Sequence, residues 1–576
     1  MLLILFLALS GALLTLAYRR MAPYLARVVG LKDTQTTPAH TRRDGLDHEP
    51  ARWSWLLPQH FSAIAAAGPI VGPILAATYF GWLPAWAWII VGSILVGGIH
   101  DFMTLVASVR HDARSIAEVV RQHMNRRSHV LFLLFVFVSL LYVIVAFADV
   151  TAGAFTQAGD GSGDAPGPAV ATSSLLYLLL AVAMGLTMRH LKWGEGRAQL
   201  VFLPLVFLAI VAGRWFPLDI AELVPGLPPQ TTWNYLLFAY CIVAALSPMW
   251  LLLQPRGALG GYFLYIIIVA GVLGIVVGGL SGELALVAPA MGPANLFTTN
   301  GTLPPMFPIL FITIACGACS GFHAIVASGT TSKQLDREVD AKRVAYGGML
   351  LEAFFACISL AAVMIMAQPS GRPDAIFSEG VAQFLHHATF GLVPVGVAHT
   401  FALLCFATFI FDTLDACTRL ARYVLMELLG WQGKGRAVVA TVLTLAGPAF
   451  LASLPPATVA GQSLPLWRVF WNLFGTSNQL LAALTLLGLT MWLLRKGRAA
   501  WLTLGPAILM LVMTMWSLGL TLVTHVERMQ AGPVATVQHV EAVVVLLLMG
   551  LALWLIGEAA LLARRPRTQT WATATA

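Results

Sequence analysis

The sequence predicts an all-α, polytopic bundle of about 15 transmembrane helices. Of its 576 residues, 58% are hydrophobic and only 10% are charged, whereas soluble globular domains carry about a quarter charged residues. Apolar runs of about 20 residues recur along the chain, each long enough to cross about 30 Å of hydrocarbon. So few charges cannot cover a water-facing surface, so we expect one bundle of spans rather than soluble domains in series.

The predicted spans begin at the first residue. The run 1–17 is expected to be a retained helix, because Arg19 and Arg20 follow the apolar stretch, whereas a signal peptide has its positive charge before it. The predicted spans are 1–17, 59–80, 84–108, 129–150, 172–188, 198–213, 233–253, 259–280, 306–330, 344–368, 393–416, 437–454, 467–493, 500–523 and 539–563.

The basic residues alternate with the spans. Most of the 34 Lys and Arg lie in the loops that follow odd-numbered spans or in the C-terminal tail. By the positive-inside rule these segments are cytoplasmic, and the N-terminus lies outside. The net charge of +8 is therefore explained by basic residues that orient the helices in the membrane. No segment of the sequence resembles a nucleic-acid-binding module. Residues 18–58 are expected to form a basic cytoplasmic loop, and 151–171, with Asp160 and Asp164, a flexible outer loop.

Several function classes lack their sequence signals. The chain has no Gly-x-x-x-x-Gly-Lys-[Ser/Thr] phosphate loop, so transport would draw on an ion or substrate gradient. No nucleophile, base and orienting group can be placed together, so an enzyme is not expected. All six cysteines lie in or beside apolar runs. For Cys316 and Cys319 we favour helix packing over metal or redox chemistry.

One predicted span is interrupted by a doubled Gly-Pro. Residues 65–74 read Ala-Ala-Ala-Gly-Pro-Ile-Val-Gly-Pro-Ile and contain Gly68, Pro69, Gly72 and Pro73. Proline removes an amide donor and clashes with the preceding helical turn. Non-helical backbone at membrane depth is tolerated where it is buried in protein or lines a wet cavity, and transporters bind solutes at such breaks. We favour a broken-helix site here over a simple kink.

A second interruption lies in residues 316–333, which are dominated by small and hydroxylated side chains. Such residues allow close helix approach or present oxygens to a ligand. His323 is read equally as a helix-to-helix hydrogen bond or as a functional group. Two broken spans in separate halves indicate an inverted-repeat transporter. The candidate substrate-binding residues at this break are Ser320, Gly321, Phe322 and His323.

Ionisable and amide side chains also occur inside predicted spans. Each charge costs at least about 2.5 kcal/mol near the bilayer centre and needs a partner or a function. Asp415 and Arg419 are four residues apart and are expected to form a structural ion pair. Asn478 and Gln479 are either interhelical hydrogen-bonding groups or substrate contacts. The candidate ion-coupling residues are His60, His100, Asp101, Glu352 and Asp412.

The predicted topology places these ionisable groups at one depth, just on the cytoplasmic side of the Gly-Pro break. They are therefore expected to share a polar cluster. It could be a proton site, a cation site, or a metal site using His60, His100 and Asp101, because histidine titrates near neutral pH and binds metals. The alternative is a charge network that only locks the bundle together.

Several motifs follow one another in order between about residues 55 and 485. They are Ala67–Ala76, Gly98–Phe102 with Ser108 and Arg110, Ala315–His323, Ser328–Thr331, Gly347–Glu352 and Phe474–Gln479. Together they resemble the carbon starvation protein A (CstA) family. Cys319 departs from the family pattern, which has a small aliphatic residue there. The resemblance implies a cytoplasmic-membrane carrier induced when carbon is scarce, with members associated with uptake of peptides or pyruvate. It also implies a distant likeness to inverted-repeat amino-acid transporters.

The sequence thus predicts a secondary active transporter that imports small carboxylated nutrients, peptides or pyruvate, with proton or cation coupling. The backbone at Gly72 and Gly321 is a candidate to face the substrate carboxylate, because helix N-termini suit anions. A nutrient sensor and a proton-conducting channel-like subunit are the alternatives. No cofactor is expected beyond a coupling proton or sodium ion, and the partners are the solute and the lipid bilayer. We divide the chain into a first helix (1–17), a basic loop (18–58), a transporter core (59–493) and a peripheral C-terminal part (494–576).

Overall fold

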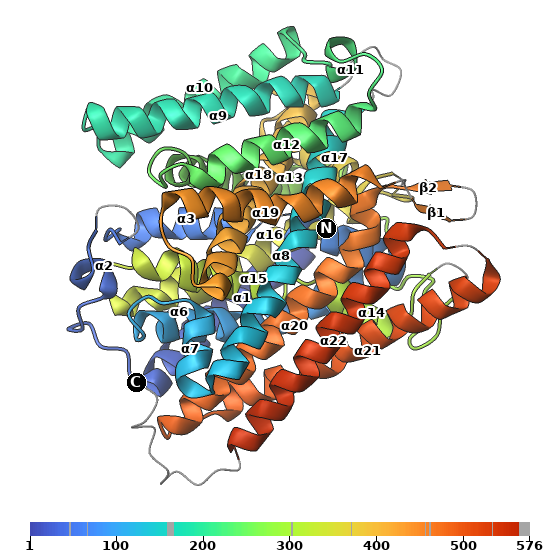
Figure 1. Cartoon of the computed structure of the whole chain (residues 1–576). Helices are drawn as coiled ribbons and strands as arrows, with labels where there is room; N and C mark the ends of the chain where they lie inside the picture. Colours follow the sequence, from blue (N-terminus) through green and yellow to red (C-terminus); the bar gives the residue numbers. More distant parts are fainter. Residues whose placement is uncertain are drawn as a thin grey trace.

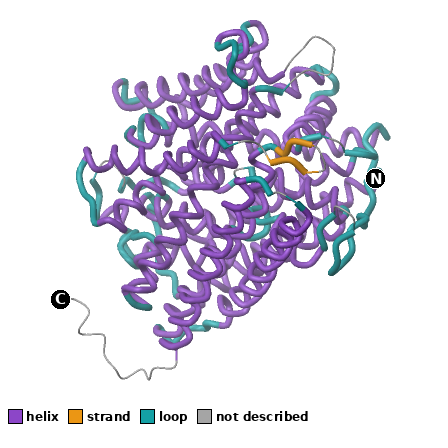
Figure 2. Tube along the Cα trace, turned by 45° about the vertical axis from the view of Figure 1, so that its right-hand side comes forward, coloured by secondary structure: helices purple, strands orange, loops and turns teal. Residues whose placement is uncertain are grey.

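The fold is an all-helical bundle with one small hairpin (Figures 1 and 2). The computed structural model describes the chain except residues 45–47, 66, 158–165, 301–302, 370, 455–456, 460–461, 533 and 564–576. The predicted loop acids Asp160 and Asp164 lie outside the described residues, as does the C-terminal tail. The hairpin pairs β1 (Ala457–Val459) with β2 (Gln462–Leu464) in antiparallel register.

The helices of the first half include one pair separated by a short break and one continuous span that contains a π-helical turn, η1 (Ser93–Gly97). They are α1 (Leu2–Val29), α2 (Pro38–Thr41), α3 (Trp53–Ile64), α4 (Gly68–Phe80), α5 (Trp82–Gly92), α6 (Gly98–Val109), α7 (Ile116–His123), α8 (Arg126–Phe155), α9 (Pro166–His190), α10 (Glu195–Trp215), α11 (Ile220–Leu223), α12 (Pro229–Leu246) and α13 (Leu253–Ser281).

The second half repeats this pattern with a broken pair and a further π-helical turn, η4 (Lys342–Tyr346). Two 3-10 turns, η2 (Thr331–Lys333) and η3 (Glu338–Asp340), precede it. The α-helices are α14 (Met306–Thr313), α15 (Gly321–Gly329), α16 (Gly347–Met364), α17 (Pro373–Ala388), α18 (Val395–Leu429), α19 (Lys434–Ser453), α20 (Leu466–Arg495), α21 (Trp501–Ala531) and α22 (Thr536–Ala563).

The described chain contains 12 helices long and apolar enough to cross a membrane, or 13 spans if the bent pair α3 and α4 is one span. These two helices meet at 46°. The two other predicted spans, 233–253 and 306–330, correspond to α12 and to the broken pair α14 and α15. The chain is therefore a multi-pass membrane protein, and the count of about 15 is an approximation that depends on how the short and broken helices are treated.

The loops gather on two opposite sides of the bundle. On the side we name the basic side, Nη1 of Arg110 donates to the carbonyl of Val29 at 2.7 Å, and the amide of Ala51 donates to Gln334 at 2.9 Å. On the opposite side, the amide of Leu83 donates to Ala290, and that of Val287 to Met364. The segments after α1, α6 and α15 thus lie on one side, and those after α4, α13 and α16 lie on the other.

Two sets of helices make matching contacts. The first set consists of the broken pair α3 and α4, the continuous span α5 to α6, and then α8, α12 and α13. The second set consists, in the same order, of the broken pair α14 and α15, the continuous span η4 to α16, and then α18, α19 and α20. Helix α4 packs on α16 while α15 packs on α6, and α12 packs on α18 while α19 packs on α8. The first set begins on the basic side at Trp53, whereas the second begins on the opposite side, after the segment 282–305. This is the arrangement of an inverted repeat.

The remaining long helices cover this core. Figure 1 shows α9 and α10 as an outer layer at the top, while α21 and α22 run side by side along the lower right. Helix α10 packs mainly against α9, and α21 packs against α20, α14 and α22. Helix α1 packs on α16 and α13. It reaches Val29 rather than residue 17, so the segment expected as a loop from 18 to 58 contains the end of α1, α2 and the start of α3.

Candidate functional site

The two helix breaks face each other in the core. A Cβ atom added to Gly68 would lie 2.3 Å from Sγ of Cys316, and one added to Gly72 would lie 2.5 Å from the carbonyl oxygen of Thr313. Pro69 occupies the first turn of α4, where proline's missing amide costs nothing. Pro73 is inside α4, so the carbonyl of Pro69 has no helical donor. The glycines of α4 therefore permit close contact between the two breaks, with the side chain of Cys316 at Gly68 and with the backbone of Thr313 at Gly72.

His323 of α15 lies at the centre of the candidate site. Its Nδ1 atom is 2.7 Å from Oδ2 of Asp101, and the other oxygen of this carboxylate is 2.7 Å from Nδ1 of His100. Its Nε2 atom is 3.2 Å from Oε2 of Glu352. All four side chains have no exposed surface. The structure therefore brings together four predicted residues from α6, α15 and α16, which we name the polar site.

The hydrogen bonding of the polar site is incomplete. An ionised carboxylate only accepts hydrogen bonds, so Asp101 orients both histidines with Nδ1–H donating. Nε2 of His323 and both oxygens of Glu352 have no hydrogen-bond partner among the described residues. Two acceptors facing each other at 3.2 Å repel unless one carries a proton. A proton on either Nε2 or Oε2 would supply the missing donor.

His60 of α3 lies on the basic side of the polar site. Its Nδ1 atom is 2.9 Å from Oγ1 of Thr331, and its ring would lie 3.2 Å from a Cβ atom on Gly348 of α16. The ring also lines a cavity of about 40 Å³, which has room for about three water molecules. His60 therefore connects α3 with the segment that follows α15 and borders a space between them.

This cavity is lined by buried polar atoms without partners. Oε1 of Gln59, Nε2 of His60 and Nε of Arg419 are buried and make no hydrogen bond among the described residues. Buried polar groups are normally hydrogen-bonded to protein or ordered water. The lining therefore fits a small polar solute or water, and Gln59 and Arg419 are site residues that the sequence did not indicate.

The amides of α20 complete the second break. Oδ1 of Asn478 accepts from the backbone amide of Phe322 at 2.8 Å and from Oγ of Ser320 at 3.2 Å. Nε2 of Gln479 donates to the carbonyl of Phe311 at 2.9 Å. The backbone amide of Phe322, which a substrate carboxylate at the start of α15 would need as a donor, is thus already bonded to Asn478. Of the two readings left open, interhelical hydrogen bonding describes their contacts here.

The backbone at Gly321 is closed by α20. A Cβ atom on Gly321 would lie 2.4 Å from the carbonyl oxygen of Asn478 and 2.4 Å from the amide of Ala482. Phe322 is also buried. In this conformation, the two glycines expected to face a carboxylate, Gly72 and Gly321, instead face the backbone of neighbouring helices.

Asp412 belongs to a second buried cluster, around Arg256. The guanidinium of Arg256 forms ion pairs with Asp412 through Nε and with Asp415 through Nη2, the latter at 2.6 Å. It also donates to the hydroxyl of Tyr240. Asp412 accepts a bond from Oγ of Ser62 in α3 at 2.7 Å. This cluster therefore ties α13 and α18 to the first broken helix.

Two sequence predictions are wrong at this cluster. Asp415 pairs with Arg256 rather than in the expected structural pair with Arg419, whose Nη2 donates to the carbonyls of Ala244 and Ser247, both at 2.8 Å. The predicted spans 233–253 and 259–280 leave Arg256 in the loop between them, on the cytoplasmic side, but it lies in the first turn of α13 with no exposed surface. Its position two residues after Gln254 and next to Pro255 gave no signal of burial.

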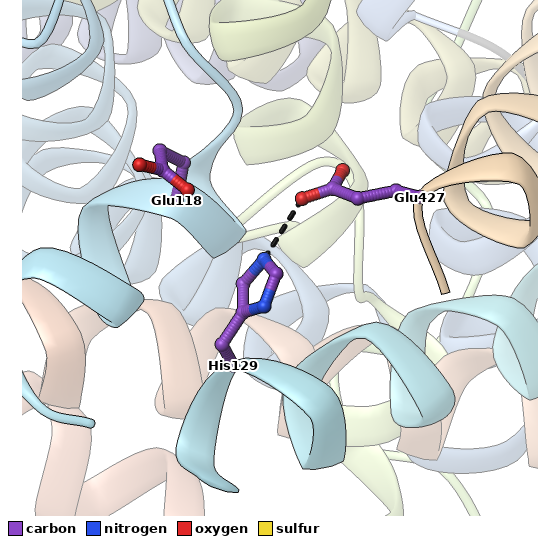
Figure 3. A group of neighbouring side chains, drawn as sticks. All are labelled: Glu118, His129 and Glu427. Carbon is purple, nitrogen blue, oxygen red and sulfur yellow. Dashed lines mark hydrogen bonds and ion pairs between the residues drawn. The ribbon is translucent and has the colours of Figure 1, made fainter. Parts of the chain in front are cut away.

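A possible metal site lies elsewhere. Among the described residues, one group of three carboxylate or imidazole ligands has its ligand atoms within 4.8 Å of one another, and it consists of Glu118, His129 and Glu427 (Figure 3). His129 lies 2.8 Å from Glu427, while Glu118 already accepts bonds from Arg114, Arg121 and Gln122. The guanidinium groups beside Glu118 oppose a cation, so we read the group as an ion-pair network joining α7, α8 and α18.

His60, His100 and Asp101 are not such a group of three. His60 bonds through Nδ1 to Thr331, whereas His100 bonds through Nδ1 to Asp101. Both residues keep a buried Nε2 atom without a hydrogen-bond partner. A metal at these three residues stays a prediction, and among the described residues no hydrogen bond joins His60 to His100 or Asp101.

The chain is similar to characterised transporters over most of its length. It is 32% identical to "Peptide transporter CstA" of Escherichia coli (strain K12), with 88% of this chain and 79% of that protein covered. It is 31% identical to "Pyruvate/proton symporter BtsT" of the same organism, with 90% and 82% covered. Among solved structures, an Eremococcus coleocola manganese transporter mutant covers 90% of this chain and 99% of its own, with 13% identity and a TM-score of 0.47.

The family described as "Carbon starvation protein CstA" matches residues 2–372 and 367–517. These matches include both helix breaks, the polar site and α20. Together with relatives above 30% identity across most of their length, they show that this chain belongs to the CstA family of membrane proteins.

Proposed function

We propose that this protein is a proton-coupled secondary transporter that imports small carboxylated nutrients, peptides or pyruvate. The observation that carries the proposal is the contact between His323, at the second helix break, and the buried carboxylates Asp101 and Glu352. Two relatives, named as a peptide transporter and as a pyruvate/proton symporter, support the substrate class and the coupling ion. The chain is proposed to act as a carrier and not as an enzyme.

The proposed orientation follows from charge. The basic side holds Lys and Arg of the segments after α1, α6 and α20, and positive loops stay in the cytoplasm. We therefore place the basic side in the cytoplasm of the inner membrane, with the N-terminus outside and the C-terminus inside. The core is assigned to residues 59–493, with residues 494–576 peripheral.

The polar site suggests how a proton would be coupled. With a proton between His323 and Glu352, helices α15 and α16 are joined by a hydrogen bond. Without it, a lone pair and a carboxylate face each other in a low-dielectric interior, and such an unpaired contact is costly. Loss of the proton therefore favours separation of α15 from α16, which would open the break beside His323. Proton binding and access to the break are linked in this way.

The cavity beside His60 suggests the cytoplasmic path. It lies between α3, α13, η2 and α18, and Arg419 and His60 supply the unpaired donor positions that a carboxylate needs. The substrate-binding residues proposed from the sequence lie at the two breaks directly beyond it. Because the breaks are closed against each other here, a solute would reach them only when α4 and α15 move apart.

Uptake by the purified protein in liposomes tests the proposal. Labelled pyruvate and a labelled dipeptide are supplied outside, with an inward proton gradient, an inward sodium gradient or neither. We expect saturable accumulation of at least one solute that depends on the proton gradient and collapses with a protonophore. Proton flux without a saturable solute would indicate a channel instead, and solute binding without uptake would indicate a sensor.

A further inference from the structure

A second cavity lies on the basic side, away from the polar site. It measures about 270 Å³ and is bordered by the end of α1, the end of α6 and the end of α20. Its lining consists of Val29, Arg110, His111, Trp492, Leu493, Lys496 and Arg498. We name this space the basic pocket.

The charges around the basic pocket are mostly unbalanced. Arg110 is neutralised by Glu338, with Nε to Oε1 at 2.7 Å. Among the described residues, the guanidinium of Arg498 donates to a neutral carbonyl, that of Val28, at 2.7 Å, and to no carboxylate. The side chain of Lys496 is exposed and has no hydrogen-bond or ion-pair partner in the part of the chain that the structure describes. Two cationic side chains therefore lack an acidic partner at the rim of one cavity.

A pair of neighbouring histidines, one of which lines the basic pocket, has lowered pKa values. Nε2 of His111 lies 2.8 Å from Nε2 of His123, and both residues lie beyond the ends of the membrane spans. Burial lowers the pKa of His111, and burial and His111 together lower the pKa of His123 to about 3. Lys496 adds to both decreases, and Arg495 adds to that of His123. Lys496 therefore lies close enough to this buried pair to disfavour a positive charge on either imidazole.

The other half of the lining is apolar. Val29, Trp492 and Leu493 are buried residues at the ends of membrane helices. The next helix begins with Trp501, which is 65% exposed. Tryptophan favours the boundary between hydrocarbon and headgroups. The pocket therefore combines a cationic rim with apolar walls at the ends of membrane helices.

We propose that the basic pocket binds the phosphate group of an anionic ligand, and that the ligand is the headgroup of an anionic phospholipid. Basic pockets between membrane helices on the cytoplasmic side are suited to such headgroups. The cations at Lys496 and Arg498 would take the phosphate oxygens, while Trp492 and Leu493 would contact the glycerol and the first methylene groups. Free phosphate offers the same oxygens but none of the apolar contacts. This inference is independent of the transported solute.

Lipid retention by the full-length protein tests the inference. Wild type, Lys496→Gln and the charge reversal Lys496→Glu are purified in detergent and incubated with equal amounts of phosphatidylglycerol or phosphatidylcholine. Native mass spectrometry then measures the bound lipid. The matched control is Arg127→Gln, which removes one exposed positive charge from the start of α8 on the same side.

We expect wild type and Arg127→Gln to retain phosphatidylglycerol in preference to phosphatidylcholine. Lys496→Gln should weaken retention of phosphatidylglycerol by about fivefold, the effect of one interfacial cation, and Lys496→Glu should weaken it further. Equal retention of both lipids by wild type, or equal losses in Lys496→Gln and Arg127→Gln, would overturn the proposal.

Inorganic phosphate distinguishes the two sources of the phosphate group. It is added at constant ionic strength, and bound phosphatidylglycerol and the unfolding temperature are measured. Lipid retained against phosphate supports the headgroup as the ligand. Displacement of the lipid by phosphate, with stabilisation that Lys496→Gln abolishes, supports a site for the phosphate group itself with a soluble ligand.

Discussion

Nε2 of His323 and Oε2 of Glu352 lie 3.2 Å apart inside the bundle, and neither atom has a hydrogen-bond partner among the described residues. The other nitrogen of the same ring is fixed by Asp101 at 2.7 Å. The imidazole therefore cannot turn away from Glu352 without losing its bond to Asp101. One proton decides whether this contact between α15 and α16 is attractive or repulsive.

Replacing Glu352 with glutamine tests the coupling. The amide of Glu352→Gln can donate permanently to Nε2 of His323, so the site keeps the contact without binding or releasing a proton. We expect uptake driven by a proton gradient to fall by about tenfold or more, corresponding to one charge-assisted hydrogen bond. Exchange of labelled for unlabelled solute at equal pH should fall less than gradient-driven uptake, because exchange needs no net proton movement and only the opening of this contact is hindered.

The control for this experiment is Glu379→Gln, which makes the same chemical change at an exposed position on α17. It should leave gradient-driven uptake unchanged. If Glu352→Gln also accumulates solute like wild type, Glu352 is not the coupling group and the polar site only holds the bundle together.

The buried ion cluster at Arg256 makes a prediction about stability. Arg256→Met leaves Asp412 and Asp415 without their cation, and breaking a buried pair on one side typically costs about 3–5 kcal/mol. We expect a clear decrease in unfolding temperature in detergent. The triple variant Arg256→Met, Asp412→Asn, Asp415→Asn removes the unpaired charge and should recover most of the loss. Equal instability of the single and triple variants would show that shape rather than charge matters here.

A methyl group at Gly321 should separate α15 from α20. The added Cβ of Gly321→Ala would lie 2.4 Å from the carbonyl oxygen of Asn478, and overpacking of this kind costs about 1–3 kcal/mol. We expect a lower unfolding temperature and impaired uptake. Gly505→Ala is the matched control, since a Cβ there meets nothing within 4 Å. A loss of the same size in both variants would contradict the packing argument.

The histidine pair outside the spans predicts a dependence of stability on pH. The pKa of His123 is lowered from 6.5 to about 3 by burial, by His111, and by Arg495 and Lys496. The folded protein therefore binds fewer protons than the unfolded chain between these values. Stability from this group is fully present above about pH 6.5 and is lost as the pH falls towards 3.

The measurement is the unfolding temperature of wild type and His123→Gln at pH 7.5 and at pH 5. Other groups titrate in this range, so the informative quantity is the difference between the two proteins. Wild type should lose more stability on acidification than His123→Gln, whose amide can still bond to His111. Identical pH profiles would show that protonation of the pair is not linked to folding.

Much of the fold was accessible from local sequence because a membrane imposes strong local rules. The apolar runs gave the spans, and the doubled Gly-Pro at Gly68 and Gly72 marked the first break. The cluster of His100, Asp101, His323 and Glu352 could also be predicted, because a known direction for each span fixes the depth of its residues. The depth of a residue in the membrane could not predict which side chains are in contact, since that depends on the rotation of each helix about its axis.

The failures have the same origin. Arg256 follows Gln254 and Pro255 and is a short distance from an apolar run, so local pattern placed it in a loop. Its burial is decided by Asp412 and Asp415, which are more than 150 positions away along the chain. The expected partner of Asp415, Arg419, has the correct helical spacing but points to the end of α12 instead. Helical spacing is a weak predictor when a distant cation can compete.

The glycines at the first break restrict how this protein can move. Without side chains at Gly68 and Gly72, the two interrupted helices approach closely: Gly72 meets the backbone of Thr313, and Gly68 meets the short side chain of Cys316, so little room is left between them to absorb a shift. Sliding one past the other would bring atoms into collision, whereas tilting them jointly would not. The two helix breaks should therefore move together as one rigid body. The conformational change should then occur at the interfaces between these helices and the helices around them.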